Sequence, residues 1–323
     1  MDFYFVALIG FFLTLILMCL IMPIYIRTLK NHHISQAVSQ YALDEYKNKQ
    51  KTPIMGGLLF VIIPFIVYLL IDAVNRFNMI SLMIMASYLL FCLVGFLDDI
   101  LIILRGNNDG LSPKTKLIME FVFVCLIYLI FRNYIPHDIH IPFTQIVVHV
   151  PWYIFLPFMI LLYLAEANAV NFTDGMDGLC AGVSFIALLP ILIIAFLKGY
   201  LSLFLLMICI LAGLIGYLFF NFHPAKIFMG DSGSLALGAL FTALALVLNI
   251  EIALFVIGGV FVIEMFCVCL QQITVRLFHK RVFSYTPIHY AFTLKGMKET
   301  KVVLMFYILQ LILSIAGFII GIN

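Results

Sequence analysis

Five aspartates stand in three short polar stretches of an otherwise apolar chain. They are Asp98 and Asp99 in GFLDDI, Asp174 and Asp177 in NAVNFTDGMDG, and Asp231 in MGDSGS. Singly, an aspartate before a helix is usually a cap, and Asp-Gly is usually a turn. Three such clusters on one face, with lysines beside them, instead predict a Mg²⁺ site, because Mg²⁺ takes one or two carboxylates and completes its shell with water and substrate phosphates.

The spacing of the polar residues predicts different roles for neighbours. Asp98 and Asp99 point about 100° apart on a helix, so one of them can face a ligand while the other orients or neutralises a lysine. Asn168 and Asn171 are three residues apart, as are the two aspartates of DGMDG. This spacing aligns each pair on one helical face if the helix continues.

Glycines and a helix start accompany these side chains. Gly175 and Gly178 allow a close approach of the backbone, as a nucleotide or sugar site needs. In MGDSGS, Asp231 or Ser232 can cap the helix that follows, whose free N–H groups favour anions. The polar stretches therefore predict a binding site for a phosphate-bearing ligand.

The elements that must position these residues are membrane helices. Of the 323 residues, 65% are hydrophobic and 11% are charged, and the apolar residues fall in blocks of about 20, roughly one bilayer crossing each. The sequence predicts an all-α integral membrane protein with one polytopic domain over residues 1–323. Ten spans are expected, at 3–26, 54–74, 78–97, 115–134, 152–170, 179–197, 201–219, 234–249, 251–275 and 302–321.

The distribution of positive charge predicts the orientation. Lys and Arg near span ends are retained on the cytoplasmic side, and with the N-terminus outside only Arg76, Arg132 and Lys198 of the 18 fall outside. Both termini are then extracellular, and all three aspartate clusters lie at the cytoplasmic face. The net charge of +2 is too small to argue for nucleic acid as a partner.

Three glutamates lie in the interior of predicted spans, namely Glu120, Glu166 and Glu264. A glutamate at membrane depth can relay protons or ions. Near a span end it can equally extend to the interface or pair with a neighbouring helix. The sequence leaves these two interpretations open.

Six motifs, in this order, resemble the polyprenyl-phosphate N-acetylhexosamine-1-phosphate transferase superfamily, and within it the phospho-N-acetylmuramoyl-pentapeptide transferases. They cover the chain from about residue 51 onward and sit on the predicted cytoplasmic loops. They are KTPIMGG at 51–57, GFLDDI at 95–100, GLSPKTK at 110–116, NAVNFTDGMDGL at 168–179, NFHPAKIFMGDSGSLALG at 221–238, and PIH followed by LKGMKETKVV at 287–303.

The resemblance implies transfer of phospho-MurNAc-pentapeptide from UDP-MurNAc-pentapeptide to undecaprenyl phosphate with Mg²⁺, giving lipid I and UMP. This is the first membrane step of peptidoglycan synthesis. It also implies a multi-pass protein of the bacterial plasma membrane, with its catalytic face cytoplasmic, its lipid acceptor held in the membrane, and a homodimeric state.

Site residues carry over motif by motif. Asp98, Asp99 and Asp231 match the three catalytic aspartates, and Asp231 is the expected metal ligand. Lys49 and Lys51 both fit the lysine before TPIMGG, and the spacing favours Lys49. The residues that match the substrate-binding cleft are Lys49, Lys116, Asn168, Asn171, Asp174, Gly175, Asp177, Asn221, Phe228 and His289.

One loop departs from the family pattern. The pentapeptide branch usually reads PxHHHFE, whereas this chain reads PIHYAFT, so His289 keeps the first histidine and Tyr290, Ala291 and Thr293 differ. A sibling that transfers N-acetylglucosamine-1-phosphate is therefore the alternative donor specificity. The reaction can be a direct attack of the lipid phosphate or a two-step route through a phosphorylated aspartate.

A secondary transporter is the competing functional class. Transporters place acidic residues near the membrane midplane on broken helices, often in two similar halves. Here the carboxylates cluster at one interface and the two halves of the chain show no repeat. The pattern favours the enzyme.

Overall fold

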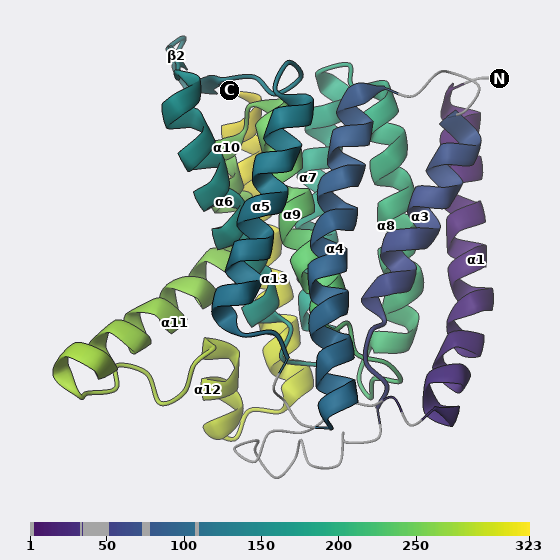
Figure 1. Cartoon of the computed structure of the whole chain (residues 1–323), viewed down its shortest axis with the longest axis vertical. Helices are drawn as coiled ribbons and strands as arrows, with labels where there is room; N and C mark the ends of the chain where they lie inside the picture. Colours follow the sequence, from purple (N-terminus) through teal and green to yellow (C-terminus); the bar gives the residue numbers. More distant parts are fainter. Residues whose placement is uncertain (1–2, 33, 35–51, 73–77, 107–109) are drawn as a thin grey trace.

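The computed structural model describes residues 3–32, 34, 52–72, 78–106 and 110–323, which form a bundle of helices (Figure 1). The helices and strands have the following bounds: α1 (Phe3–Asn31), α3 (Gly57–Asp72), α4 (Met79–Arg105), α5 (Pro113–Phe131), β1 (Asp138–His140), β2 (Val147–His149), α6 (Trp152–Thr173), α7 (Leu179–Leu197), α8 (Leu201–Asn221), α9 (Asp231–Leu248), α10 (Glu251–Ile257), α11 (Gly259–Phe278), α12 (Ile288–Leu294) and α13 (Glu299–Ile322).

Eight of the described helices are long and apolar enough to cross a bilayer, namely α1, α4, α6, α7, α8, α9, α11 and α13. The two other predicted spans are also helical. However, α3 has only 16 residues, and α5 begins with Lys114, Lys116 and Glu120 in its first turns. The chain is thus a mostly helical, multi-pass protein.

Helix α9 is the centre of the bundle, because every residue after Asp231 is buried up to Leu248. A helix that is apolar all round belongs in a core. It packs most extensively against α4 and α6, where small residues allow the backbones to meet. A side chain at Gly95 of α4 would collide with the backbone of Asp231 and Ser232, and one at Gly238 would collide with Ala167 of α6. These contacts fix the ends of α4 and α6 beside the start of α9.

The predicted ninth span is two helices rather than one. The helix breaks at Gly258, where α10 ends and α11 begins. Figure 1 shows α11 leaving the bundle at an angle, with α12 below it near the end of the molecule opposite the C-terminus. The glycine pair Gly258-Gly259 lowers the cost of the break, because glycine is a weak helix former.

A small hairpin in the segment between α5 and α6 was not predicted. Strands β1 and β2 are antiparallel, with Ile139 opposite Val148. The strands have only three residues each, so their alternating pattern is too short to separate from a loop. The all-α prediction therefore holds for the bundle but not for this hairpin.

Candidate active site

Asp231 stands at the first position of α9, where three other helices end or begin. Its Oδ2 accepts a hydrogen bond from Nζ of Lys116 on α5 at 2.5 Å, and its Oδ1 accepts one from Nδ2 of Asn171 on α6 at 2.7 Å. The Lys116 and Asp231 side chains are 14% and 25% exposed. The structure thus joins residues separated by more than 100 positions into one charged group.

The adjacent aspartates of α4 make different hydrogen bonds, although the charge of Asp231 acts on both. Asp99 accepts hydrogen bonds from the backbone N–H groups of Asp231 at 3.0 Å and Ser232 at 3.1 Å, so it satisfies the free donors at the start of α9. The expectation that Asp231 or Ser232 caps its own helix is wrong, because no side chain within α9 does so. Asp98 accepts instead from the backbone N–H of Leu111 at 2.8 Å.

A polar cavity of about 240 Å³ opens beside Asp231. Three carboxylates and one amide face it, and one aromatic ring lies at its wall. The lining residues are Ile54, Asp99, Ile102, Asn171, Asp174, Phe228, Gly230 and Asp231. A cavity with this excess of acceptor oxygens is suited to a cation and the anion that the cation carries.

The donor set fits Mg²⁺, which needs only one or two protein carboxylates. Asp231 and Asp174 both face the cavity. Burial, followed by the charge of Asp231, raises the pKa of Asp174 to about 7, although a hydrogen bond from the backbone of Gly230 opposes the shift. The proton is held because the carboxyl is buried beside the charge of Asp231, and a divalent cation in the cavity would favour the ionised form of Asp174.

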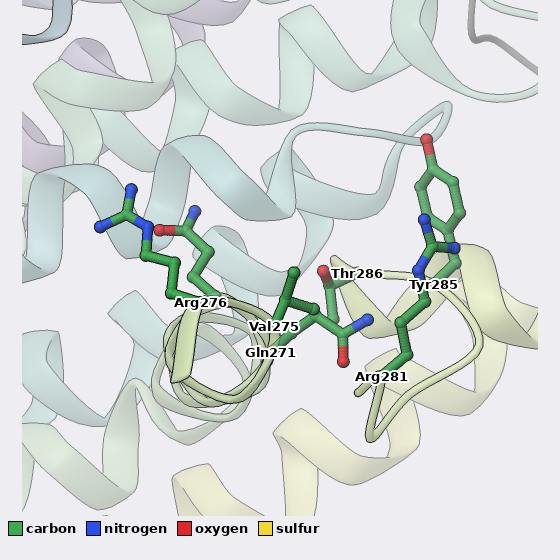
Figure 2. Close-up of a pocket in the computed structure, with 7 residues that line it drawn as sticks. Gln271, Val275, Arg276, Arg281, Tyr285 and Thr286 are labelled. Carbon is green, nitrogen blue, oxygen red and sulfur yellow. The ribbon is translucent and has the colours of Figure 1, made fainter. Parts of the chain in front are cut away.

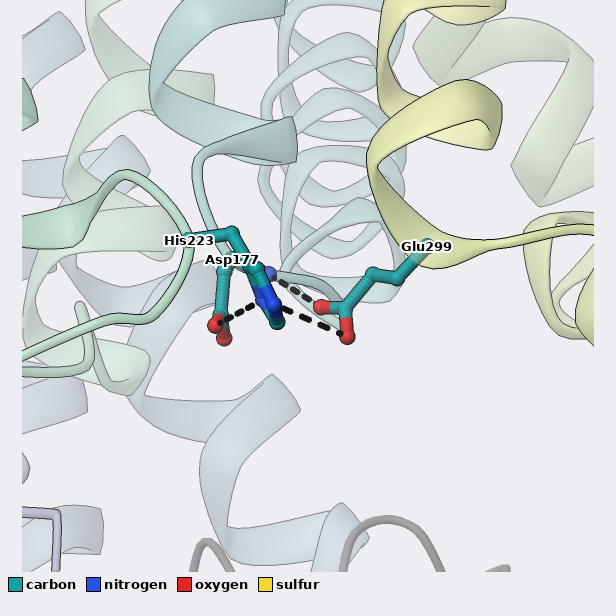
Figure 3. A group of neighbouring side chains, drawn as sticks. All are labelled: Asp177, His223 and Glu299. Atoms are coloured by element: carbon teal, nitrogen blue, oxygen red, sulfur yellow. Dashed lines mark hydrogen bonds and ion pairs between the residues drawn. The ribbon is translucent and has the colours of Figure 1, made fainter.

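The turn after α6 separates its two aspartates. Because α6 ends at Thr173, the helix does not continue, and the condition under which Asp174 and Asp177 would align on one helical face is not met. Asp177 points away to the loop before α9, where its Oδ2 accepts from the backbone N–H of Ala225 at 3.0 Å and lies 3.0 Å from Nδ1 of His223 (Figure 3).

Sequence reasoning did not assign His223 and Glu299 to this region. Glu299, at the start of α13, accepts from the backbone N–H of Asp177 at 2.9 Å, and its other oxygen lies 3.9 Å from His223 Nδ1. Among the described residues, these two side chains and Asp177 form the group of three that is close enough to share a metal ion. The pairing joins positions 122 residues apart, so no local pattern could have revealed it.

The other expected binding residues have varied surroundings. Asn168 donates to Glu120 Oε2 at 3.2 Å. The side-chain amide of Asn221 makes two hydrogen bonds to the backbone. Its oxygen accepts from Gly178 N at 3.0 Å, and its nitrogen donates to Ile227 O at 2.9 Å. Phe228 lines the cavity. Lys49 and the alternative Lys51 lie outside the described residues.

His289 and Gly175 meet on the far side of the turn. His289 is fully buried, its Nδ1 lies 2.9 Å from Oε1 of Glu264, and a side chain at Gly175 would collide with its Nε2. The structure therefore places Glu264 and Glu120 in contact with expected site residues. Glu166 is buried elsewhere, with one oxygen that has no partner among the described residues.

The pKa of Asp174 predicts a pH-dependent stability. The unfolded chain ionises this carboxyl near its usual value of 3.8, whereas the folded protein holds the proton up to about pH 7. Folding therefore loses stability as the pH rises from about 4 through 7. In metal-free detergent solution with EDTA, Asp174→Asn is expected to gain melting temperature relative to the wild type between pH 5 and pH 8. A difference that does not change with pH would contradict this.

Comparison with known proteins gives a consistent family. The model of glycosyl transferase family 4 matches residues 81–249. A phospho-N-acetylmuramoyl-pentapeptide-transferase of Staphylococcus saprophyticus is 37% identical over 327 residues, covering 99% of both chains. Those of two Staphylococcus aureus strains, bovine RF122 and MSSA476, are 37% and 35% identical, each covering 96% of this chain and 98% of the relative.

Proposed function

Because this chain belongs to glycosyl transferase family 4 and to the phospho-N-acetylmuramoyl-pentapeptide transferases within it, we propose that it transfers phospho-MurNAc-pentapeptide from UDP-MurNAc-pentapeptide to undecaprenyl phosphate. The products are lipid I and UMP. The observation that carries the proposal is the group of Asp231, Lys116 and Asn171 at the edge of a carboxylate-lined cavity.

The proposed topology has ten crossings, with the chain ends outside and the site at the cytoplasmic face of a bacterial plasma membrane. Two observations support it. The start of α1 and the end of α13 lie at the same end of the bundle (Figure 1). The basic residues, apart from Arg76, Arg132 and Lys198, fall in the segments assigned to the cytoplasm.

Asp231 is the proposed holder of Mg²⁺, with Asp174 facing the same cavity. When bound, the ion supplies positive charge to the diphosphate oxygens of the donor. Lys116 supplies a second positive charge at the same point, because its ammonium already lies against Asp231. The start of α9 adds the field of its helix end, although Asp99 occupies the first N–H groups.

The proposed reaction is a direct displacement. An oxygen of the lipid phosphate forms a bond to the sugar-bearing β-phosphorus, the bond to the bridging oxygen breaks, and UMP leaves. Asp98 orients the lipid phosphate and can take its proton, a small contribution because the second pKa of a phosphate monoester is about 6. Isolation of a phospho-sugar enzyme adduct without lipid acceptor would replace this route by the two-step one.

The nucleotide and sugar side of the cleft is assigned to the turn after α6 and the loop before α9. The ring of Phe228 is the proposed contact of the uracil, and Asn221 holds the backbone of the preceding residue, Ile227, in place. The further proposed contacts of the donor are Lys49, Asn168, Asn171, Asp174 and Gly175. Asp177 and His289 are proposed to serve the donor by holding this turn, because Asp177 bonds to the loop before α9 and His289 is buried against Gly175.

The acceptor must keep its polyprenyl tail in lipid while its phosphate reaches the cavity. Helix α11 leaves the bundle, and Ile263, Phe266 and Ile273 on it are exposed. We assign α11 as one wall of the groove that receives the tail, and we propose a homodimer as the working assembly. Neither proposal needs a nucleic acid partner.

The test is UMP release by purified protein with Mg²⁺ and undecaprenyl phosphate, with UDP-MurNAc-pentapeptide and UDP-GlcNAc as separate donors. We expect turnover of the muramoyl donor alone, and its loss in EDTA with recovery on added Mg²⁺. Turnover of UDP-GlcNAc alone would place the chain in the sibling branch. No UMP release with either donor would favour the transporter.

A further inference from the structure

The backbone of the turn at residues 174–178 is held from two sides. On one side, the backbone N–H of Asp177 donates to Glu299, and the Tyr307 hydroxyl donates to Gly178 O at 2.6 Å, both from α13. On the other side, the Tyr290 hydroxyl of α12 donates to Gly175 O at 2.8 Å, and His289 packs on Gly175. The turn that carries Asp174 therefore depends on the placement of α12.

Helix α12 is held in turn by one buried carboxylate of α11. Glu264 is fully buried, and its Oε2 accepts from the backbone N–H of Ile288 at 2.7 Å. Its Oε1 accepts from the backbone N–H of His289 at 3.3 Å and lies 2.9 Å from His289 Nδ1. A carboxylate that accepts several hydrogen bonds holds its donors more strongly than a neutral acceptor does.

The contact with Glu264 also orients the imidazole, because it holds Nδ1 at the carboxylate and leaves Nε2 directed at Gly175. Nε2 is buried at Gly175 and has no hydrogen-bond partner among the described residues. The ring of Tyr290 packs on His289 with centroids 4.2 Å apart, so the two side chains contact Gly175 as one unit.

We propose that Glu264 is a positioning residue, which acts through His289 and Tyr290 to fix the turn at residues 174–178 for the donor substrate. The inference rests on the proposed function, because it assigns that turn to the donor. The proposal also gives a role to Tyr290, which stands in this chain at the position where the family pattern has its second histidine. Its hydroxyl reaches the carbonyl of Gly175, which no phenylalanine could do.

The experiment compares full-length wild type with Glu264→Gln, Glu264→Asp and Tyr290→Phe. Two control variants make the same kinds of substitution, Glu to Gln and Tyr to Phe, at the other end of the bundle. Glu251→Gln alters a buried glutamate at the start of α10, and Tyr153→Phe removes an exposed hydroxyl near the start of α6. The measured quantities are kcat, the KM of the muramoyl donor, the KM of undecaprenyl phosphate, and amide hydrogen exchange of residues 174–178.

We expect Glu264→Gln and Tyr290→Phe to raise the donor KM about tenfold, the effect of losing one buried hydrogen bond. The acceptor KM should stay unchanged when it is measured at a donor concentration far below the donor KM, where the donor site is mostly empty. Amides of the turn should exchange faster in both variants. Glu264→Asp, which keeps the charge, should recover part of the donor affinity. Neither control should change the donor KM.

A merely structural role predicts a different pattern. Glu264→Gln would then lower kcat and melting temperature together, leaving donor KM and turn exchange at wild-type values, and the proposal would be overturned. If wild-type protein fails to use the muramoyl donor, the proposed function fails, but the exchange of residues 174–178 still decides whether Glu264 positions the turn.

Discussion

Asp231→Asn is expected to lower UMP release at least about a thousandfold, the scale of losing a main electrostatic group in an active site. The substitution keeps the shape of the side chain but removes the charge that Lys116 contacts at 2.5 Å and that Asn171 contacts at 2.7 Å. It also removes the proposed ligand of Mg²⁺. The measurement is the initial rate of UMP release at saturating Mg²⁺, donor and lipid acceptor.

A buried aspartate away from the site provides the control. Asp72, at the end of α3, accepts from the Tyr68 hydroxyl at 2.6 Å and from Ser202 at 3.1 Å. Asp72→Asn should lower the melting temperature but leave the rate per folded molecule close to wild type. If Asp231→Asn and Asp72→Asn lost the same small part of the rate, the central place of Asp231 would be wrong.

Gly95→Ala is expected to have the largest effect on stability. The new methyl group would overlap the backbone of Asp231 and Ser232, which cannot turn aside as a flexible side chain can. Overpacking of this kind costs about 3 kcal/mol or more. The change also pushes Asp99 away from the N–H groups that it satisfies at the start of α9. We expect a much lower melting temperature in detergent and little UMP release.

Gly321→Ala near the end of α13 is the matched control. There the nearest atom to a new methyl group is the Cδ1 of Ile194 at 2.8 Å, the far end of a flexible side chain that can move. We expect a small change of melting temperature and normal turnover. Equal losses in the two variants would show that the α4 and α9 contact is not specially tight.

The sequence predicted the helical bundle because long apolar blocks are a strong signal. It also predicted that Asp98 and Asp99 point in different directions, because their angular separation follows from helix geometry alone. Their hydrogen-bond partners do differ, and their separate roles stay a prediction. It ended the fifth span at residue 170, close to the end of α6 at Thr173, and it aligned Asp174 with Asp177 only if the helix continued, which it does not. The break at Gly258 was not predicted, because glycine is common within membrane helices.

Long-range contacts explain the other omissions. The sequence left the role of Glu264 open because its hydrogen-bond partners lie on α12, which folds back onto α11 through a loop. Glu299 and His223 meet Asp177 only after α13 and the loop before α9 are placed. Segments that carry the family motifs line the cavity, but the motifs did not distinguish side chains that face the cavity from side chains that hold the turn.

The break at Gly258 has a consequence for the order and energetics of substrate binding. Helix α11 leaves the bundle there, and through Glu264 it carries α12, which contacts Gly175. If α11 is the wall of the lipid groove, as proposed, a displacement of α11 by the entering lipid would be transmitted to the donor turn. Such linkage is reciprocal, so the factor by which the lipid changes donor affinity equals the factor by which the donor changes lipid affinity.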